Sequence, residues 1–278
     1  MSIRITTLIE NIRGEHLGLE CEHGISFYIK TDDTAVLFDT GKSNKFIKNA
    51  EELGIDLTKV EHVVLSHGHY DHTGGFKYLV EKIGNSFDFH ISKDFFDKKY
   101  GFNGLAYQFL GSNFDKRYLR KNDINTEYVT DDMVEISKGI YLFSNFKQVY
   151  EYEKINPRFY KENNNKLVVD RFEDEIVVAI ETNKGLLVIL GCSHPGVVNI
   201  LEAIINRTGK TIYGIVGGTH LVEADNQRIV HTLEYFEEKK IKLLGICHCT
   251  GERAIKELKK FKEQFFYNST GTSIIIDE

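Results

Sequence analysis

The chain has 278 residues, of which 41% are hydrophobic and 27% charged, and its formal net charge at pH 7 is -6. This length is enough for one large α/β domain with a sizeable buried core. The negative charge argues against broad binding of nucleic acids or anionic membranes, and no stretch reaches the roughly 18 consecutive apolar residues of a membrane span. We therefore expect a small-molecule substrate, without a nucleic-acid or membrane partner.

The N-terminus and the cysteines predict a cytoplasmic protein. Residues 1–6 alternate in polarity like a strand and lack the apolar core of a signal peptide. The four cysteines are too few and too unevenly spaced for a disulfide framework. Three of them, Cys192, Cys247 and Cys249, stand beside candidate metal ligands. This pattern fits a reducing compartment.

The first 86 residues predict alternating strands and helices. Period-two runs between short polar turns predict strands, while Ser43 and Gly54 predict the start and end of the first helix. The expected strands cover residues 3–9, 24–30, 34–38 and 63–65, and the expected helices cover residues 44–53 and the segment after Gly75. The chain therefore begins as a layered α/β fold.

Four groups that can bind a metal follow the strand that ends near Leu65. His67, His69, Asp71 and His72 stand in the order H-x-H-x-D-H. Three imidazoles and a carboxylate in one turn are awkward core groups, whereas one or two divalent cations supply the missing positive partner. We expect His67 and His69 on one side of a loop and a helix from about residue 73. Asp71 and His72 would reach a second ion about 3.5–4 Å away. A surface histidine cluster is the alternative.

Between about residues 87 and 171 the composition changes, and aromatic residues, asparagine and lysine become frequent. Strands are expected at 89–91, 128–129 and 140–143, helical turns near 95–96 and 107–110, and a mobile loop at 156–166. Because loops on a rigid scaffold often carry specificity, we interpret this region as a cap that supplies substrate contacts. The candidate wall residues are Phe95, Phe96, Tyr107 and Phe109. A structural subdomain or a homodimer interface is the alternative.

Regular patterns return after residue 171. The expected elements are a hairpin over 175–190, helices over 197–205, 226–239 and 252–265, and strands over 211–216, 243–247 and 273–276. Three successive strands each lead to a histidine, namely His194, His220 and His248. Repeated units of strand and helix place such residues together at one edge of a sheet.

These motifs resemble those of the metallo-β-lactamase-fold hydrolases. The resemblance rests on Phe38-Asp39-Thr40-Gly41 and the H-x-H-x-D-H motif, and on segments 191–196, 217–221 and 247–251, which are similar to one branch of the superfamily. Members of that branch are described as dihydropteroate-synthase-like or as making a ribofuranosyl-aminobenzene-phosphate pterin. The resemblance implies an α/β fold, an αββα sandwich. Residues 1–86 and 171–278 would form its core, and residues 87–170 would be inserted.

The resemblance also implies a set of metal ligands. His67 and His69 would hold one ion, and Asp71 and His72 the other. His194 is expected to be the third ligand of the first ion, and His248 is expected to complete the second site as the last histidine of the superfamily does. The expected metal is a divalent transition metal, one or two ions per chain, with zinc preferred and iron or manganese as alternatives.

One feature of the superfamily is missing from this sequence. After the glycine-terminated strand the superfamily has an acidic bridging ligand, and here the strand leads to Cys192 and His194. Cys192 could bridge as a thiolate or be a small buried residue, and Asp174 or Glu175 could supply the carboxylate instead. Each of these alternatives stays open at this point.

The remaining polar residues have less specific interpretations. His220 follows two glycines and could be a ligand, a proton donor, a substrate contact or a hydrogen-bonded histidine beneath the site. Asp39 is expected to orient a ligand histidine through its other ring nitrogen. Cys247 and Cys249 alternate about His248, so in a strand they would point away from it, which favours a structural role.

The expected function is metal-dependent hydrolysis. Metal-bound hydroxide would attack a phosphorylated or pterin-like small molecule, with Asp71 orienting the water and His220 as a second catalytic candidate. Two alternatives remain: a di-iron redox protein that needs a separate flavin partner, and a metal-stabilised binding protein without turnover, which the missing bridging acid allows. A fold and a metal site leave the substrate open.

Overall fold

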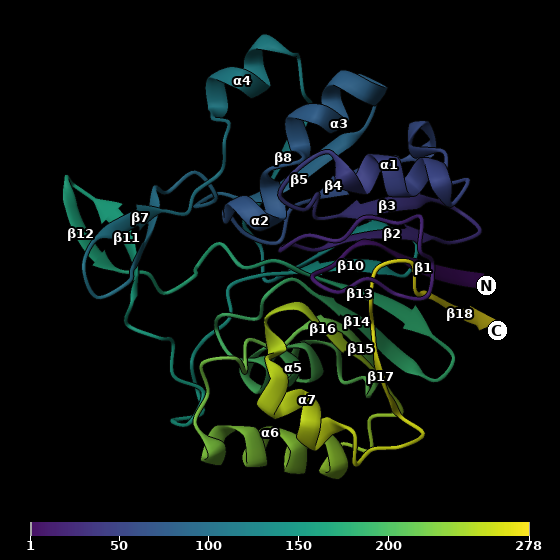
Figure 1. Cartoon of the computed structure of the whole chain (residues 1–278), viewed down its shortest axis with the longest axis vertical. Coiled ribbons are helices and arrows are strands. Elements are labelled where there is room, and N and C mark those ends of the chain that lie inside the picture. The colour runs from purple at the N-terminus through teal and green to yellow at the C-terminus, as the bar shows by residue number, and fades with distance from the viewer. Residues whose placement is uncertain (1, 278) are drawn as a thin grey trace. The chain divides into compact units, whose positions relative to one another are not determined.

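The computed structural model describes residues 2–277, whose elements are shown in Figure 1. These residues form two compact units. The first unit comprises residues 2–130, 157–174 and 269–277, and the second comprises residues 131–156 and 175–268. No helix within residues 2–277 is long and apolar enough to cross a membrane.

The first unit contains a seven-stranded sheet in the order β18-β1-β2-β3-β4-β5-β8. Its strands are β1 (Ser2–Ile9), β2 (Ser26–Lys30), β3 (Ala35–Phe38), β4 (His62–Val64), β5 (Asp88–Ser92), β8 (Thr126–Val129) and β18 (Ser273–Asp277). β18, β1, β2 and β3 pair antiparallel, and β3, β4, β5 and β8 pair parallel. Because β3 and β4 are parallel neighbours, the loops that follow Phe38 and Val64 leave the sheet at the same edge.

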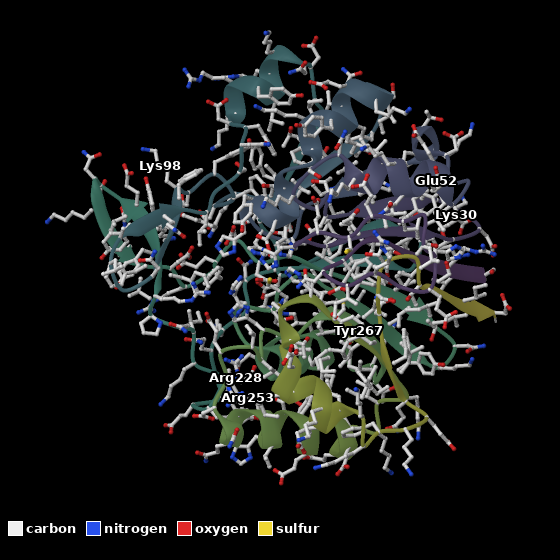
Figure 2. The ribbon with its side chains drawn as sticks, in the orientation of Figure 1. Lys30, Glu52, Lys98, Arg228, Arg253 and Tyr267 are labelled. Carbon is white, nitrogen blue, oxygen red and sulfur yellow. The ribbon has the colours of Figure 1, made fainter. Side chains whose placement is uncertain are left out.

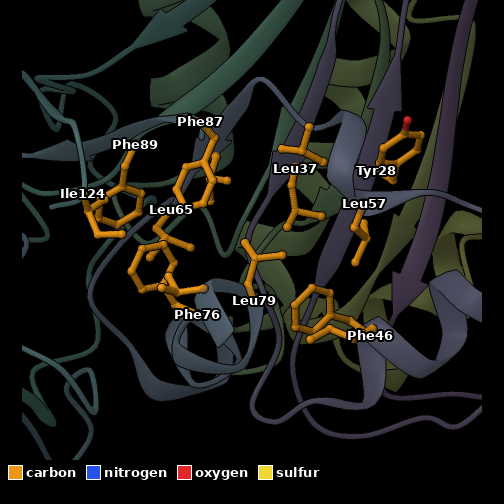
Figure 3. Close-up of a cluster of buried hydrophobic side chains, with 14 of the residues drawn as sticks. Tyr28, Leu37, Phe46, Leu57, Leu65, Phe76, Leu79, Phe87, Phe89 and Ile124 are labelled. Atoms are coloured by element: carbon orange, nitrogen blue, oxygen red, sulfur yellow. The ribbon is translucent and has the colours of Figure 1, made fainter. Parts of the chain in front are cut away.

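Helices cover one face of this sheet. They are α1 (Lys45–Glu52), α2 (Tyr70–Thr73), α3 (Phe76–Ile83) and α4 (Lys116–Lys121), with a short 3₁₀ turn, η1 (Leu57–Lys59). Apolar side chains of α1 and α3 form one buried cluster with side chains of the strands (Figure 3). Within it the ring of Phe76 stacks on Phe89 with centroids 4.3 Å apart. The predicted cap Ser43 donates to Glu22, and Asn44 stands at the N-cap position of α1.

A second, smaller sheet belongs to the same unit and has the order β12-β11-β6-β7. Its strands are β6 (Lys99–Phe102), β7 (Tyr107–Phe109), β11 (Phe159–Asn163) and β12 (Lys166–Val169). Lys98, labelled in Figure 2, precedes β6 and pairs with Glu162 on β11.

Two predictions for this small sheet were wrong. The expected mobile loop at 156–166 is instead the hairpin of β11 and β12, whose turn residues Asn164 and Asn165 both have positive φ angles, 50° and 59°. Asparagine tolerates this conformation, which tight hairpin turns require. The expected helical turn at 107–110 is strand β7, since pairing with β6 outweighs local propensity.

The second unit has its own seven-stranded sheet in the order β17-β16-β15-β14-β13-β10-β9. Its strands are β9 (Met133–Ser137), β10 (Ile140–Phe143), β13 (Val177–Thr182), β14 (Gly185–Leu190), β15 (Ile212–Gly218), β16 (Leu243–Cys247) and β17 (Phe265–Tyr267). β14, β15 and β16 are parallel neighbours. The segments that carry His194, His220 and His248 therefore leave this sheet at one edge, as predicted.

Three helices pack on this sheet and share a buried cluster with its strands (Figure 1). They are α5 (Val197–Thr208), α6 (Asn226–Glu238) and α7 (Glu252–Leu258). Arg253 at the start of α7 donates to the backbone oxygen of Ala224 and to Asn226 of α6 (Figure 2). The helix predicted to reach residue 265 ends at Leu258, because residues 265–267 pair with β16 as β17.

The predicted inserted region supplies strands to all three sheets. β5 and β8 lie in the large sheet of the first unit, and β9 and β10 lie in the sheet of the second. The small sheet has no strand from outside residues 87–170. The division at residues 87 and 170 stays a prediction as a statement about domains, and all four strands of the small sheet come from that interval.

Candidate metal centre

The loop after β3 and the helix that carries Asp71 and His72 are in close contact. α2 begins at Tyr70, earlier than predicted. The backbone N–H of Thr40 donates to the carbonyl oxygen of His72 at 2.8 Å. A Cβ atom on Gly75 would lie only 2.1 Å from the carbonyl oxygen of Thr40, so glycine is required for this approach.

Asp39 connects this loop to the histidines. Its Oδ2 atom lies 2.6 Å from Nδ1 of His72, and both side chains are completely buried. Asp39 itself has a positive φ of 60°, a conformation that costs free energy. In this conformation its carboxylate contacts Ser66, which follows β4. Asp39 thus lies where the sequence predicted, at the second ring nitrogen of a candidate ligand histidine, and the ligand role of that histidine stays a prediction.

Ser66, which sequence reasoning missed, extends this network to His67. Its hydroxyl lies 2.7 Å from Asp39 Oδ2 and 2.9 Å from Nδ1 of His67. A carboxylate only accepts, so the single hydroxyl hydrogen goes to Asp39 and the hydroxyl accepts from Nδ1–H of His67. Asp39 therefore sets the tautomer of His72 directly and that of His67 through Ser66. The motif Leu65-Ser66-His67 contained this signal, because a hydroxyl one residue before a ligand histidine can reach its Nδ1.

His67 and His69 converge as two ligands of one ion would. Nε2 of His67 lies 3.0 Å from Nδ1 of His69, and both side chains are buried. In a tetrahedral zinc site with Zn–N bonds of about 2.0–2.1 Å, two nitrogens lie about 3.3 Å apart. Because Nδ1 of His67 is the protonated nitrogen, its Nε2 presents a lone pair. The donor set therefore fits a divalent transition metal.

Asp71 and His72 form the second half of the motif. Nε2 of His72 lies 3.7 Å from Oδ2 of Asp71. The same carboxylate oxygen lies 3.3 Å from Nε2 of His23, whose side chain is 55% exposed. A Cβ atom on Gly24 would lie 2.5 Å from the carbonyl oxygen of Asp71, so glycine allows the segment with His23 to approach α2. The sequence pattern assigned no site role to His23.

Two phenylalanine rings lie against the paired histidines. Phe172 makes edge contacts with His67 and His69 at centroid distances of 6.3 Å and 5.4 Å, and Phe159 lies 5.7 Å from His69. The aromatic side chains expected at this position were others, and Phe95 instead belongs to the hydrophobic core of the first unit. Phe159 was missed because it falls in the loop expected at 156–166, and no sequence pattern singled out Phe172.

A buried lysine holds these elements together. Lys99 is 1% exposed and donates to Asp170 at 2.7 Å and to Asp174 at 2.9 Å. The second oxygen of Asp174 accepts the backbone N–H of Gly68, between the two histidines, at 2.8 Å. Burial disfavours the charge of Lys99, but the two aspartates raise its pKa above the usual value. The carboxylate of Asp174 thus positions the histidine loop.

In the second unit, Glu175 has a comparable role at another histidine loop. Its carboxylate accepts the backbone N–H groups of Ser193 at 3.0 Å and His194 at 3.3 Å. The rings of His194 and His220 lie 4.2 Å apart. Ser193, His220 and His248 all have positive φ angles, between 47° and 64°. Non-glycine residues in this conformation cluster at functional sites, which suits the strand edge where the three histidines were expected.

The position of Cys249 differs from the expectation of a purely structural cysteine. β16 ends at Cys247, and His248–Thr250 form a 3₁₀ turn, so the strand alternation on which that expectation rested does not continue. The ligand atoms of Cys192, His220 and Cys249 all lie within 4.8 Å of one another. Burial raises the pKa of the Cys249 thiol, but hydrogen bonds with Cys192 and His220 lower it to about 5. Burial lowers the pKa of His220, but hydrogen bonds to Cys249 and Glu223 raise it to about 9.

Within each unit the structure brings predicted site residues together. His67, His69, Asp71 and His72 form one group in the first unit, and His194 and His220 are neighbours in the second. Their roles as metal ligands, with that of His248, stay predictions. Asp39 is added to the first group by its contact with His72.

Comparisons with known proteins agree with these motifs. A family model described as the metallo-beta-lactamase superfamily matches residues 20–143. A protein of Methanocaldococcus jannaschii, named 7,8-dihydropterin-6-methyl-4-(beta-D-ribofuranosyl)-aminobenzene-5'-phosphate synthase, is 32% identical over 281 residues. That alignment covers 95% of this chain and 93% of the relative.

Solved structures show the same similarity. The crystal structure of Tm1679, described as a metal-dependent hydrolase of the beta-lactamase superfamily, has a TM-score of 0.86 and 32% identity, and the match covers 99% of this chain and 100% of that chain. A diphosphatase of the PhnP family has a TM-score of 0.56 at 14% identity, covering 99% of this chain and 98% of that chain. The second likeness concerns the fold alone.

Proposed function

Because this chain belongs to the metallo-beta-lactamase superfamily, we propose that it is a metal-dependent enzyme that transfers a group of a phosphorylated or pterin-like small molecule, with water as the acceptor. The fold class predicted from the sequence is confirmed by the TM-score of 0.86. The reaction and the substrate are the proposed part.

The observation that carries the proposal is that Asp39 determines which ring nitrogen of His72 and of His67 carries the hydrogen. One buried carboxylate contacts Nδ1 of His72 and, through Ser66, determines the hydrogen on Nδ1 of His67. Both rings therefore present Nε2 as a lone pair. Metal-binding histidines commonly have such a carboxylate partner, which fixes ring orientation and raises basicity.

The donor set suits one or two ions. We propose that His67 and His69 hold the first ion and that Asp71 and His72 hold the second, and by the resemblance of their motifs we assign His194 to the first and His248 to the second. Three imidazoles at the first ion, and two imidazoles with a carboxylate at the second, favour zinc, with iron and manganese as the alternatives. When bound, such a metal supplies an acidic water and stabilises negative charge on the substrate.

Asp71 is the proposed proton acceptor. Its Oδ2 atom would take a proton from the attacking water, and Nε2 of His23, 3.3 Å away, would receive that proton next. The imidazole of His23 is 55% exposed and can return the proton to solvent. His220 stays a second catalytic candidate, since a raised pKa of about 9 gives its ring a proton to donate to a leaving group.

The proposed substrate class rests on the surroundings of the histidine loop and on the name of a relative. The rings of Phe159 and Phe172, which are 4% and 1% exposed, pack against His69 and make those surroundings apolar, which suits a substrate with an aromatic group. The relative from Methanocaldococcus jannaschii is named for a product that contains a dihydropterin, an aminobenzene and a phosphate. That name is of a synthase, so the acceptor of the transferred group is tested separately from the metal dependence.

The test is a turnover assay on metal-reconstituted protein with a panel of phosphoesters, diphosphoesters, pterin phosphates, lactones and thioesters, each with and without an arylamine acceptor. We expect product with a phosphorylated or pterin-like compound, and a loss of at least about 100-fold in His69→Ala. Turnover that survives chelation and the His69→Ala change would contradict the proposal. Product that forms only when the arylamine is present would replace hydrolysis by synthesis while keeping the metal centre.

A further inference from the structure

The second unit contains a group of soft metal ligands, of which the proposed function uses only His220, as its second catalytic candidate. A metal-bound His220 would be neutral and would not serve as that proton donor. Cys192 follows β14, His220 follows β15 and Cys249 follows β16, and these three strands are parallel neighbours. One ligand atom from each residue, two Sγ atoms and an imidazole nitrogen, lies within 4.8 Å of the other two. Cys192 is 4% exposed and His220 is 8% exposed, so the group is shielded from solvent.

The backbone around this group is shaped to bring the sulfur of Cys249 inward. A Cβ atom on Gly218 would lie 2.7 Å from Sγ of Cys249, so the sulfur occupies space that any other residue at position 218 would fill. Sγ of Cys249 also lies 3.4 Å from the backbone oxygen of Cys192.

Other contacts fix the loops that carry the three ligands. His220 has a φ of 47°, a conformation that costs a non-glycine residue free energy. The hydroxyls of Thr219 and Thr250 hydrogen-bond at 3.0 Å, which ties the loop after β15 to the turn after β16. Ser193 donates to the backbone oxygen of Gly218 at 2.8 Å, which ties the loop after β14 to β15. All three loops are therefore held in place by neighbours.

We propose that Cys192, His220 and Cys249 form a metal site of the Cys₂His type, which takes a thiophilic divalent cation such as zinc or cadmium and leaves its fourth position open. Two thiolates and one imidazole match the ligand types and the count of open tetrahedral zinc sites. Thiolate ligands favour soft over hard cations, so the site should discriminate against magnesium and calcium. Coordination requires thiolate sulfur and a neutral imidazole, so binding releases protons.

The site is tested with full-length protein that has been reduced, stripped of metal and titrated with cobalt(II) under anaerobic conditions. Cobalt reports the ligand type, because thiolate ligation gives charge-transfer absorption in the near ultraviolet and histidine or carboxylate ligation does not. We expect this band in the wild type. Cys249→Ser should reduce its intensity to roughly half, because one of two thiolates is lost, and should weaken cadmium binding by about tenfold or more.

Matched variants distinguish this site from the histidine centre, by which we mean His67, His69, Asp71 and His72, and from a cysteine elsewhere in the chain. Cys21→Ser changes a cysteine of the first unit and should leave the band unchanged. His69→Ala removes a ligand of the proposed catalytic metal and should also leave it unchanged, so failure of the proposed function and failure of this inference have different signatures. Circular dichroism confirms that each variant is folded, and His220→Gln provides a second variant with the same expected loss of cadmium affinity.

Three results would overturn the inference. The first is a band of full intensity in Cys249→Ser, which would leave Cys192 as the one thiolate ligand. The second is a band that disappears in His69→Ala, which would assign the thiolate to the histidine centre. The third comes from X-ray absorption at the zinc edge, measured on the His69→Ala variant loaded with one zinc ion per chain. Fewer than two sulfur neighbours at about 2.3 Å from the zinc would contradict the proposed site.

Discussion

Oδ2 of Asp39 lies 2.6 Å from Nδ1 of His72, and neither side chain is exposed to solvent. Asp39 stands at the end of β3 and His72 on α2, and a further hydrogen bond from Thr40 to the backbone of His72 joins the same two segments. A buried carboxylate in this position determines which nitrogen of the imidazole is available as a ligand. We therefore expect metal binding by His72 to depend on a residue that lies 33 positions away in sequence.

The first prediction concerns this contact. Asp39→Asn should weaken metal binding by about 10- to 100-fold, because the amide no longer stabilises the imidazole as a carboxylate does. Competition with a chromophoric chelator measures the change. Asp33→Asn, in the exposed turn between β2 and β3, is the matched control and should bind metal as the wild type does. Equal affinity in Asp39→Asn and wild type would show that Asp39 has no part in metal binding.

The second prediction compares two adjacent lysines. Lys99→Met leaves Asp170 and Asp174 buried without their cation, and we expect it to destabilise the fold by about 3–5 kcal/mol. Lys98→Met removes an exposed ion pair with Glu162 and should cost about 0–1 kcal/mol. Urea denaturation of both variants measures the difference.

A stability difference alone would not show that Lys99 positions the histidine loop. Because Asp174 accepts the N–H of Gly68, Lys99→Met should also weaken metal binding at temperatures where the variant is fully folded. Lys98→Met should not. If the folded Lys99→Met protein binds metal with unchanged affinity, the lysine stabilises the small sheet and has no role in the metal centre.

The third prediction concerns the two phenylalanine rings beside the histidines. Phe172→Leu and Phe159→Leu should lower kcat/KM by roughly tenfold, about 1.4 kcal/mol, because these nearly buried rings pack against His67 and His69 and hold the histidine loop in place. Phe109→Leu, on the exposed strand β7, is the control for loss of an aromatic ring in the small sheet. A change of kcat/KM in Phe109→Leu alone would support the wall residues expected from the sequence over the rings beside His69.

The fourth prediction is a pH dependence of stability that arises from His90. Burial and the neighbouring ring of His62 lower the pKa of His90 from 6.5 to about 4. Nδ1 of His62 lies 3.1 Å from Nε2 of His90. The unfolded state therefore binds a proton below pH 6.5 that the folded state binds only near pH 4. The contribution of this group is fully present above pH 6.5 and is lost as the pH falls to 4, a difference of about 3 kcal/mol.

This contribution is isolated by comparing variants in the metal-free protein. His90→Gln should lose less stability than the wild type between pH 6.5 and pH 4, measured by urea denaturation at each pH. His231→Gln, a half-buried histidine on α6, should retain the wild-type slope. Parallel curves for wild type and His90→Gln would contradict the assignment of this pH dependence to the pair of His62 and His90.

Most of the large sheets could be predicted because their strands are apolar runs bounded by turn residues. β14 is an unbroken apolar segment that ends at Gly191, and β15 and β16 have the same character, so the edge that carries the histidines was predictable. The small sheet was not, since β11 is mostly polar and partly buried while β12 is a short run with every residue exposed, and neither has a period-two pattern strong enough to distinguish it from a loop. The pair Asn164-Asn165 was the one local signal of their hairpin.

The site was predictable where its residues are close in sequence, and less so where the fold brings together residues that are far apart in sequence. The motif from His67 to His72 could be interpreted from spacing alone. The contact of Lys99 with Asp170 and Asp174 joins residues more than 70 positions apart, and spacing carries no information about it. The end of β16 at Cys247 was predicted correctly, but the 3₁₀ turn of residues 248–250 that follows it was not, and this turn removes the strand alternation from which a structural role of Cys249 was predicted.

The central claim is that the histidine and aspartate motif binds a transition metal, and elemental analysis tests it most directly. Protein purified without an affinity tag that carries metal, incubated with zinc, manganese or iron(II) and then desalted, should retain one to two ions per chain at the histidine and aspartate motif, in addition to the ion proposed for Cys192, His220 and Cys249. The double variant His67→Ala and His69→Ala should retain fewer, and Cys249→Ser in that background fewer still. Wild-type protein with less than about 0.2 ion per chain after all three incubations would contradict the claim.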